Sequence, residues 1–97
     1  MKIHWHEAAI IEFDDAALYY GAIDSELGER FATATNVAVA QIKARPLQAR
    51  RWDGEARKVR VRRFPYAVIY SMDEDTLNIV SVMHLHREPG YWHERVP

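Results

Sequence analysis

The apolar residues of the first half of the chain recur at intervals of three and four positions. Two stretches carry this spacing, with Ala9, Phe13, Ala16, Tyr20 and Ile23 in the first, and Leu27, Phe31, Ala34, Ala38 and Ile42 in the second. Because such spacing puts apolar side chains on one face of a helix, it predicts two consecutive amphipathic helices.

The boundaries of both helices are marked by local signals. Asp24 and Ser25 interrupt the pattern, and their side-chain oxygens can cap a new helix by accepting hydrogen bonds from its free amides. Pro46 disfavours helical geometry at Arg45, so the second helix should end near Ala44. Two helices joined by so short a turn predict an antiparallel hairpin.

Strand patterns flank this hairpin on both sides. Residues 2–6 alternate, with Ile3 and Trp5 on one face and His4 and His6 on the other, which is typical of a short strand. Residues 47–56 are expected to form a loop that contains the turn signal Asp53-Gly54. Three further strands are predicted over Arg57–Phe64, Tyr66–Met72 and Leu77–Leu85.

The connector Asp73-Glu74-Asp75 is tight and acidic, so the last two strands should form a hairpin. Residues 66–72 contain no charged residue, and we expect this strand to be central. This order of strands and helices predicts one α+β domain over residues 1–97. We expect an N-terminal strand and a two-helix antiparallel hairpin packed on an antiparallel sheet, which a C-terminal three-strand meander completes. The expected core residues are Phe13, Phe31, Val61, Val68, Tyr70, Ile79 and Val82.

Basic residues alternate with valine in the strand that begins at Arg57. Lys58, Arg60 and Arg62 should share one face, while Val59 and Val61 occupy the other. We therefore expect the guanidinium groups of Arg60 and Arg62 to point to water and both valines to lie beneath the helices.

The formal net charge of −1 conceals a strong segregation of charge. Residues 43–63 contain nine Lys and Arg against two Asp and Glu, a local net charge of +7. Such polarity suits an anionic partner. The competing interpretation is that these charges only keep an exposed loop and strand edge from pairing with other chains.

Several classes of site are excluded or disfavoured by composition. The chain has no cysteine, which excludes disulfides, thiolate zinc sites and cysteine nucleophiles. Its four glycines form no phosphate-binding loop, and no Ser-His-Asp grouping is visible. There is no signal-peptide pattern and no apolar run of the roughly 20 residues that a membrane helix needs. We expect a cytoplasmic protein with no cofactor and no membrane partner.

Other candidate sites are weaker. His4 with His6, and His84 with His86, each place two imidazoles on one strand face, which could be half of a metal site if the strands are neighbours. With no third ligand visible, surface histidines are the favoured interpretation and no metal is expected. Glu12, Asp14 and Asp15 are interpreted as acidic residues that solvate a helix.

Four local features carry a resemblance to a known family. They are Ala17-Leu18-Tyr19-Tyr20, Leu27-Gly28-Glu29-Arg30-Phe31, the basic strand that ends in Phe64-Pro65-Tyr66, and Val68-Ile69-Tyr70 followed by Ile79-Val80-Ser81-Val82-Met83-His84 and Arg87. In this order the chain resembles the RelE/ParE superfamily of bacterial type II toxin-antitoxin modules, also called plasmid stabilisation proteins. The resemblance implies a toxin that is neutralised in a hetero-oligomer by an antitoxin encoded beside it.

One branch of the superfamily, the RelE-like toxins, cleaves messenger RNA on the ribosome. The resemblance to it implies proton transfer at an RNA 2′-hydroxyl and cationic stabilisation of the phosphorane. The candidate catalytic residues under this alternative are Arg60, Arg62, His84, Arg87 and Tyr91. His86 is a second histidine that could titrate near neutrality. The match is incomplete, because Leu85 stands where such enzymes tend to carry a cation and leaves Arg87 as a displaced substitute.

The other branch, the ParE-like toxins, poisons DNA gyrase by binding and needs a surface rather than catalytic groups. This is the favoured interpretation, with a third alternative that the chain is a non-toxic family member that only binds antitoxin. The candidate partner-binding residues are Lys58, Arg60, Arg62, Arg63, Arg87, Tyr91 and Trp92. Tyr91 and Trp92 could anchor an interface from an exposed tail. Alternatively, the tail folds back and their rings complete the core.

Overall fold

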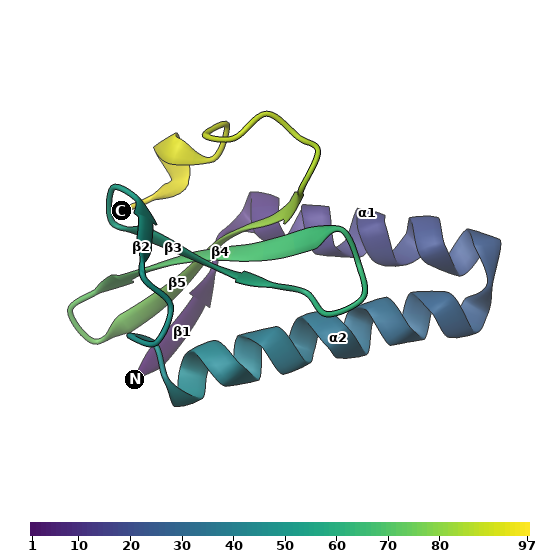
Figure 1. Cartoon of the computed structure of the whole chain (residues 1–97), viewed down its shortest axis with the longest axis horizontal. Coiled ribbons are helices and arrows are strands. Elements are labelled where there is room, and N and C mark those ends of the chain that lie inside the picture. Colours follow the sequence, from purple (N-terminus) through teal and green to yellow (C-terminus); the bar gives the residue numbers. More distant parts are fainter.

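One mixed five-stranded sheet, in the order β1-β5-β4-β3-β2, carries both helices on one face (Figure 1). The computed structural model describes all 97 residues. Its elements are β1 (Lys2–Trp5), α1 (Glu7–Ile23), α2 (Ser25–Ala44), β2 (Arg51–Asp53), β3 (Ala56–Arg60), β4 (Tyr66–Asp73), β5 (Thr76–His84) and a 3-10 helix (His93–Arg95). Strand β1 pairs with β5 in parallel, and all other pairs are antiparallel. No helix has the length and apolar character required to cross a membrane.

The α+β class, the helical hairpin and the central position of β4 confirm the sequence predictions. Helix α2 begins after Asp24, whose carboxylate accepts a hydrogen bond from the amide of Glu26 at 2.9 Å, as the capping signal predicts. Helix α1 is capped by His6, whose Nδ1 accepts from the amide of Ala8 at 3.0 Å. This role for His6 was not predicted, because histidine is an uncommon cap.

Two strand predictions are wrong. Residues 51–53 form the edge strand β2 instead of a loop, and its pairing with β3 is irregular and too short to leave a sequence pattern. Strand β3 ends at Arg60 rather than Phe64. The amide of Val61 donates to the carbonyl of Tyr66 at 2.9 Å, which closes a turn over residues 62–65. Arg62 and Arg63 therefore lie in a turn and not on the strand.

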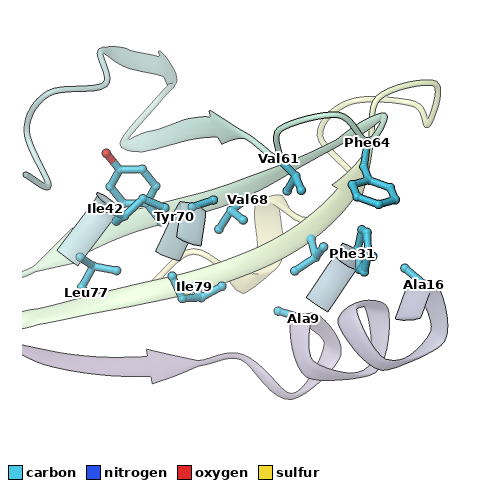
Figure 2. Packing of buried hydrophobic residues seen from close by; sticks show 12 residues of the cluster. Ala9, Ala16, Phe31, Ile42, Val61, Phe64, Val68, Tyr70, Leu77 and Ile79 are labelled. Atoms are coloured by element: carbon cyan, nitrogen blue, oxygen red, sulfur yellow. The ribbon is translucent and has the colours of Figure 1, made fainter. Parts of the chain in front are cut away.

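The core between the helices and the sheet contains the expected residues. Six of the seven are buried in it, and Phe13 packs against it half-buried. Figure 2 shows Phe31 of α2 beside Phe64, and their ring centres are 5.2 Å apart. Val61 is completely buried and Val59 is half-buried against this cluster, so the predicted direction of both valines is confirmed. Ile23 was expected on the buried face but is 63% exposed, because it ends α1 beyond the sheet.

The opposite face of the sheet has a second, smaller core. It consists of Ala56, Ala67, Ile69, Val80, Met83 and Trp92. Trp92 belongs to the C-terminal tail, which we define as residues 85–97. Figure 1 shows this tail, in yellow, on the side of the strands away from α2. Both faces of the sheet are therefore covered, one by helices and one by the tail.

The two helices approach each other closely at Gly28. A Cβ atom there would lie 2.8 Å from the Cα of Gly21 and 3.0 Å from the carbonyl oxygen of Ala17, whereas a Cβ at Gly21 would meet nothing within 4 Å. Because both neighbours of Gly28 are backbone atoms, the helices would have to separate to admit a side chain.

We predict that Gly28→Ala destabilises the fold by about 1–3 kcal/mol through overpacking. Gly21→Ala is the matched control, and it should be neutral or stabilising by up to about 1 kcal/mol, since alanine favours a helix over glycine. Thermal denaturation of both variants measures the difference. Equal melting temperatures would contradict the close helix contact.

Candidate functional site

Glu12 of α1 joins the helices, the sheet and the tail. Its Oε1 accepts hydrogen bonds from the Ser81 hydroxyl at 2.9 Å, the Val82 amide at 3.1 Å and the Arg95 guanidinium at 2.9 Å. Its Oε2 accepts from the Tyr91 hydroxyl at 2.8 Å. Side-chain exposure is 16% for Glu12 and 18% for Arg95, so this ion pair is largely shielded from water. The carboxylate is compensated by one cation and three further donors, as a buried charge requires.

The position of Glu12 follows from the topology of the sheet. Strand β1 leaves β5 after the pair Trp5 and Ile79, so the remainder of β5 is an edge with unpaired backbone groups. A register shift opposite Ile69 and Tyr70 adds to this irregularity. Helix α1 crosses that edge, and the Glu12 carboxylate supplies the acceptor that the Val82 amide lacks. The interpretation of Glu12 as a solvating residue is therefore wrong, whereas Asp14 and Asp15 are exposed as expected.

Tyr91 lies at the junction between this network and the surface. Burial raises the pKa of its phenol to about 12, while the neighbouring Ser81 hydroxyl lowers it and the neighbouring Glu12 raises it further. The hydroxyl consequently keeps its proton at neutral pH and donates to Glu12. The guanidinium of Arg87 lies over the ring, 4.0 Å from its centre. Tyr91 thus presents its ring to an exposed cation and its hydroxyl to the interior.

Trp92 is fully buried, so of the two alternatives for its ring the structure favours completion of a core and not an exposed interface anchor. Its ring lies on the second core, 5.6 Å from the ring centre of Trp52 in β2. The Lys58 ammonium is 4.2 Å from the Trp52 ring centre, and His93 Nε2 lies 2.8 Å from an oxygen of Asp53. The tail is held by these contacts because the outer face of the sheet is apolar and needs a cover.

The expected cationic residues remain at the surface but are divided between separate places. Lys58, Arg60, Arg62, Arg63 and Arg87 are all exposed, and none of them forms an ion pair. Lys58 and Arg60 project from β3 on the side of the tail. Arg62 and Arg63 instead line a groove beside α2. The single basic face expected from the alternating pattern is thus two surfaces.

The five residues expected for RNA cleavage do not converge on one site. His84, Arg87 and Tyr91 line a cleft of about 320 Å³ between α1 and the tail. Arg60 is paired in register with Ala67 of the second core, so it lies on the opposite face of the sheet from His84, whose register partner Tyr66 packs on the first core. Arg62 lies in the turn beside α2.

The chemistry of this cleft is mixed in charge. Besides the three expected residues, the cleft is lined by the carboxylates of Glu12 and Asp15 and by Tyr19 and Tyr66. His84 Nδ1 accepts a hydrogen bond from the amide of His86 at 3.1 Å, which leaves Nε2 as the free ring nitrogen. Arg95 already compensates Glu12, but Asp15 has no ion-pair partner, and its carboxylate opposes the approach of a phosphate.

The pair His4 and His6 lies far from the pair His84 and His86, as the register between β1 and β5 shows. Strands β1 and β5 are neighbours, but His4 is paired in register with Asn78, whereas His84 is the last residue of β5. His6 caps α1 through Nδ1. No group of three or more His, Asp or Glu side chains is placed to hold a metal ion.

The order of strand, helical hairpin and sheet agrees with the resemblance that the sequence motifs carry. The family model described as ParE toxin of type II toxin-antitoxin system, parDE, matches residues 3–89, and the chain belongs to this family. The solved structure described as the chromosomal ParDE TA system from P. aeruginosa has the same fold, with a TM-score of 0.78 at 13% sequence identity. That match covers 89% of this chain and 97% of the other. No curated protein sequence gives a significant match.

We predict that Glu12→Ala destabilises the fold by about 3 kcal/mol, because it leaves Arg95 without its partner in a shielded site and removes the acceptor of the Val82 amide. Asp14→Ala, an exposed carboxylate two positions away on the same helix, is the control and should change stability by less than about 0.5 kcal/mol. Urea denaturation measures both values. Indistinguishable midpoints would show that the Glu12 network contributes nothing to stability.

The raised pKa of Tyr91 predicts a loss of stability in alkali. A phenol whose pKa is about 12 when folded and 10.0 when unfolded contributes its full stabilisation below pH 10, and the contribution is lost as pH rises from 10 towards 12. Tyr91→Phe should therefore flatten the decline in this range. It should not abolish the decline, since burial also raises the pKa of Tyr20, Tyr66 and Tyr70. Urea midpoints at several alkaline pH values test this, and parallel curves for both proteins would refute it.

Proposed function

We propose that the chain is a ParE-like toxin that inhibits DNA gyrase by binding to it and that a cognate antitoxin, encoded by the adjacent gene, neutralises it. Membership of the ParE toxin family supports the toxin role. Binding is favoured over catalysis because Arg60 and Arg62 lie apart from His84. A binding inhibitor needs exposed groups and no convergent catalytic site. The protein would act in the cytoplasm, where gyrase works.

Exposed cations on the tail side of the sheet are the proposed gyrase-binding groups. Lys58 and Arg60 extend from β3, and Arg87 is stacked on Tyr91. None of the three cations forms an ion pair within the chain. Arginine and aromatic side chains dominate the energetics of protein interfaces, and an Arg held on a tyrosine ring loses less conformational freedom on binding. Trp92 contributes from beneath by holding the tail against the sheet.

A second candidate function is ribosome-dependent cleavage of messenger RNA. It is favoured by the cleft that His84, Arg87 and Tyr91 share. A general base must titrate near the working pH, and the Tyr91 phenol does not, since its pKa is about 12. His84 would have to transfer the proton, in a cleft that also contains two carboxylates. Binding remains the better supported mechanism.

The two candidate functions predict different effects of His84→Ala on growth arrest. Under the gyrase proposal this substitution leaves growth arrest unchanged, since His84 is required only for catalysis. Lys58→Glu with Arg60→Glu should weaken arrest, because charge reversal on the proposed binding face repels an acidic surface. Growth after induction in a host without the antitoxin measures both variants, with protein levels checked by immunoblot.

Nucleic acids from the same cultures separate the mechanisms. Gyrase-dependent DNA breaks with intact messages agree with the proposal. Codon-specific cleavage of messages that disappears with His84→Ala would replace it with the ribonuclease function. Wild-type chain that binds the product of the adjacent gene without arresting growth would identify a non-toxic family member.

A further inference from the structure

Two hollows adjoin at the edge of the sheet that β2 forms. One has a volume of about 430 Å³ and lies between the end of α2 and β3, with Arg45 and Ala49 in its lining. The other has a volume of about 520 Å³ and is lined by Ala49, Arg50, Arg51, Trp52 and Lys58. Figure 1 shows the chain rising from the end of α2 to β2 along this edge. We call the four cations of the two hollows the β2 rim.

The segment that leads into β2 is fixed to the sheet. The hydroxyl of Tyr70 donates a hydrogen bond to the carbonyl of Pro46 at 2.8 Å. The guanidinium of Arg57 donates to the carbonyl of Ala49. Because residues 46–49 are held at both ends, the cations beside them are attached to an ordered backbone. Binding of an anion there costs less conformational entropy than binding to a flexible loop.

The positive charge of the β2 rim is largely uncompensated. Arg45, Arg50 and Lys58 are exposed and form no ion pair. Arg51 lies 3.8 Å from Glu55, but the two side chains are 63% and 69% exposed, and an ion pair so open to water is weak. No carboxylate lines either hollow. An anion can therefore reach several cations without meeting a like charge.

Protection of the sheet edge does not account for these cations. Lys and Arg on an exposed strand discourage pairing with other chains. Strand β2, however, has only three residues and an irregular pairing with β3, and both features already blunt an edge. Arg45 and Arg50 precede the strand, so they do not guard its free backbone groups.

The lining favours a phosphate backbone over a protein partner. Protein interfaces depend on aromatic and other large anchors. The one aromatic ring in the two linings is that of Trp52, which the Lys58 ammonium covers at 4.2 Å and which packs against Trp92. Contacts to a nucleic-acid backbone need only cations at suitable positions. Because the rest of the chain is net acidic, its charge distribution also turns the β2 rim towards a polyanion.

We propose that the β2 rim binds the phosphate backbone of duplex DNA without reading its sequence. The choice of DNA rests on the proposed function, since gyrase acts on DNA. Lys58 belongs both to the β2 rim and to the proposed gyrase-binding groups, so the two surfaces are continuous. The chain can then contact gyrase and the DNA that gyrase holds at the same time.

The test measures the affinity of the purified chain for a short labelled duplex of mixed sequence by fluorescence anisotropy at several salt concentrations. With three unpaired cations on phosphates, the logarithm of the binding constant should fall against the logarithm of salt concentration with a slope of about −3. Arg45→Gln with Arg50→Gln should weaken binding at least about tenfold at low salt and reduce the slope by about 2.

A matched control removes the same charge elsewhere. Lys2→Gln with Arg30→Gln changes two exposed cations outside the β2 rim, and Lys2 belongs to β1 at the opposite edge of the sheet. This variant should stay within about twofold of wild type. Circular dichroism shows whether both double variants are folded. Equal affinity and equal salt slope for wild type and Arg45→Gln with Arg50→Gln would overturn the proposal.

A second measurement locates the contact without any substitution. Addition of the duplex to the labelled wild-type chain should shift backbone amide signals in the NMR spectrum mainly at residues 45–52 and 58. Shifts centred on another part of the chain would overturn the assignment. Single-stranded RNA of the same length that binds at least about tenfold more tightly than the duplex would overturn the choice of DNA.

Failure of this inference is distinguishable from failure of the proposed function. If the wild-type chain inhibits gyrase but has no measurable affinity for the duplex at low salt, the β2 rim assignment is overturned and the gyrase function remains. If the chain leaves gyrase active but loses DNA affinity in Arg45→Gln with Arg50→Gln, the β2 rim assignment stands and the gyrase function falls.

Discussion

The carboxylate of Glu12 is the group on which the arrangement of helices, sheet and tail depends. It replaces the neighbouring strand that β5 lacks beyond Ile79, and it binds Tyr91 and Arg95 of the tail through the same two oxygens. A carboxylate removed from water is tolerated only when its acceptor sites are filled. Because the acceptor belongs to α1 and the donors belong to β5 and to the tail, forming this network fixes the relative positions of these three parts. The tail is then placed to cover the apolar outer face of the sheet.

The packing of the tail on the sheet determines which side chains are exposed to partners. With Trp92 buried, the groups left outside are Arg87 on the tail and the cations of β3 and the following turn. These cations face two directions, since β3 ends at Arg60 and the turn carries Arg62 and Arg63 towards α2. These exposed cations therefore form two separate surfaces, one on the tail side of the sheet and one beside α2.

Local features of the fold were predictable from the sequence, and long-range features were not. The helical stripes, the Asp24 cap and Pro46 act over a few residues, so both helix boundaries agree with the structure. The role of Glu12 depends on contacts with residues about 70 positions away, which no periodicity reveals. The alternation of Arg and Val continues in the sequence beyond Arg60, where β3 ends. The pattern therefore does not reveal the turn that follows Val61. Burial of Trp92 was an open alternative, since an apolar ring suits both a core and an interface.

The proposed function is inhibition by binding a protein and not by cleaving RNA. The most direct measurement adds the purified chain to purified gyrase with relaxed plasmid and ATP, and in parallel to ribosomes translating a defined message. Inhibition of gyrase by binding should give loss of supercoiling with accumulation of cleaved plasmid, while the message stays intact. Unimpaired supercoiling together with a cleaved message would contradict it.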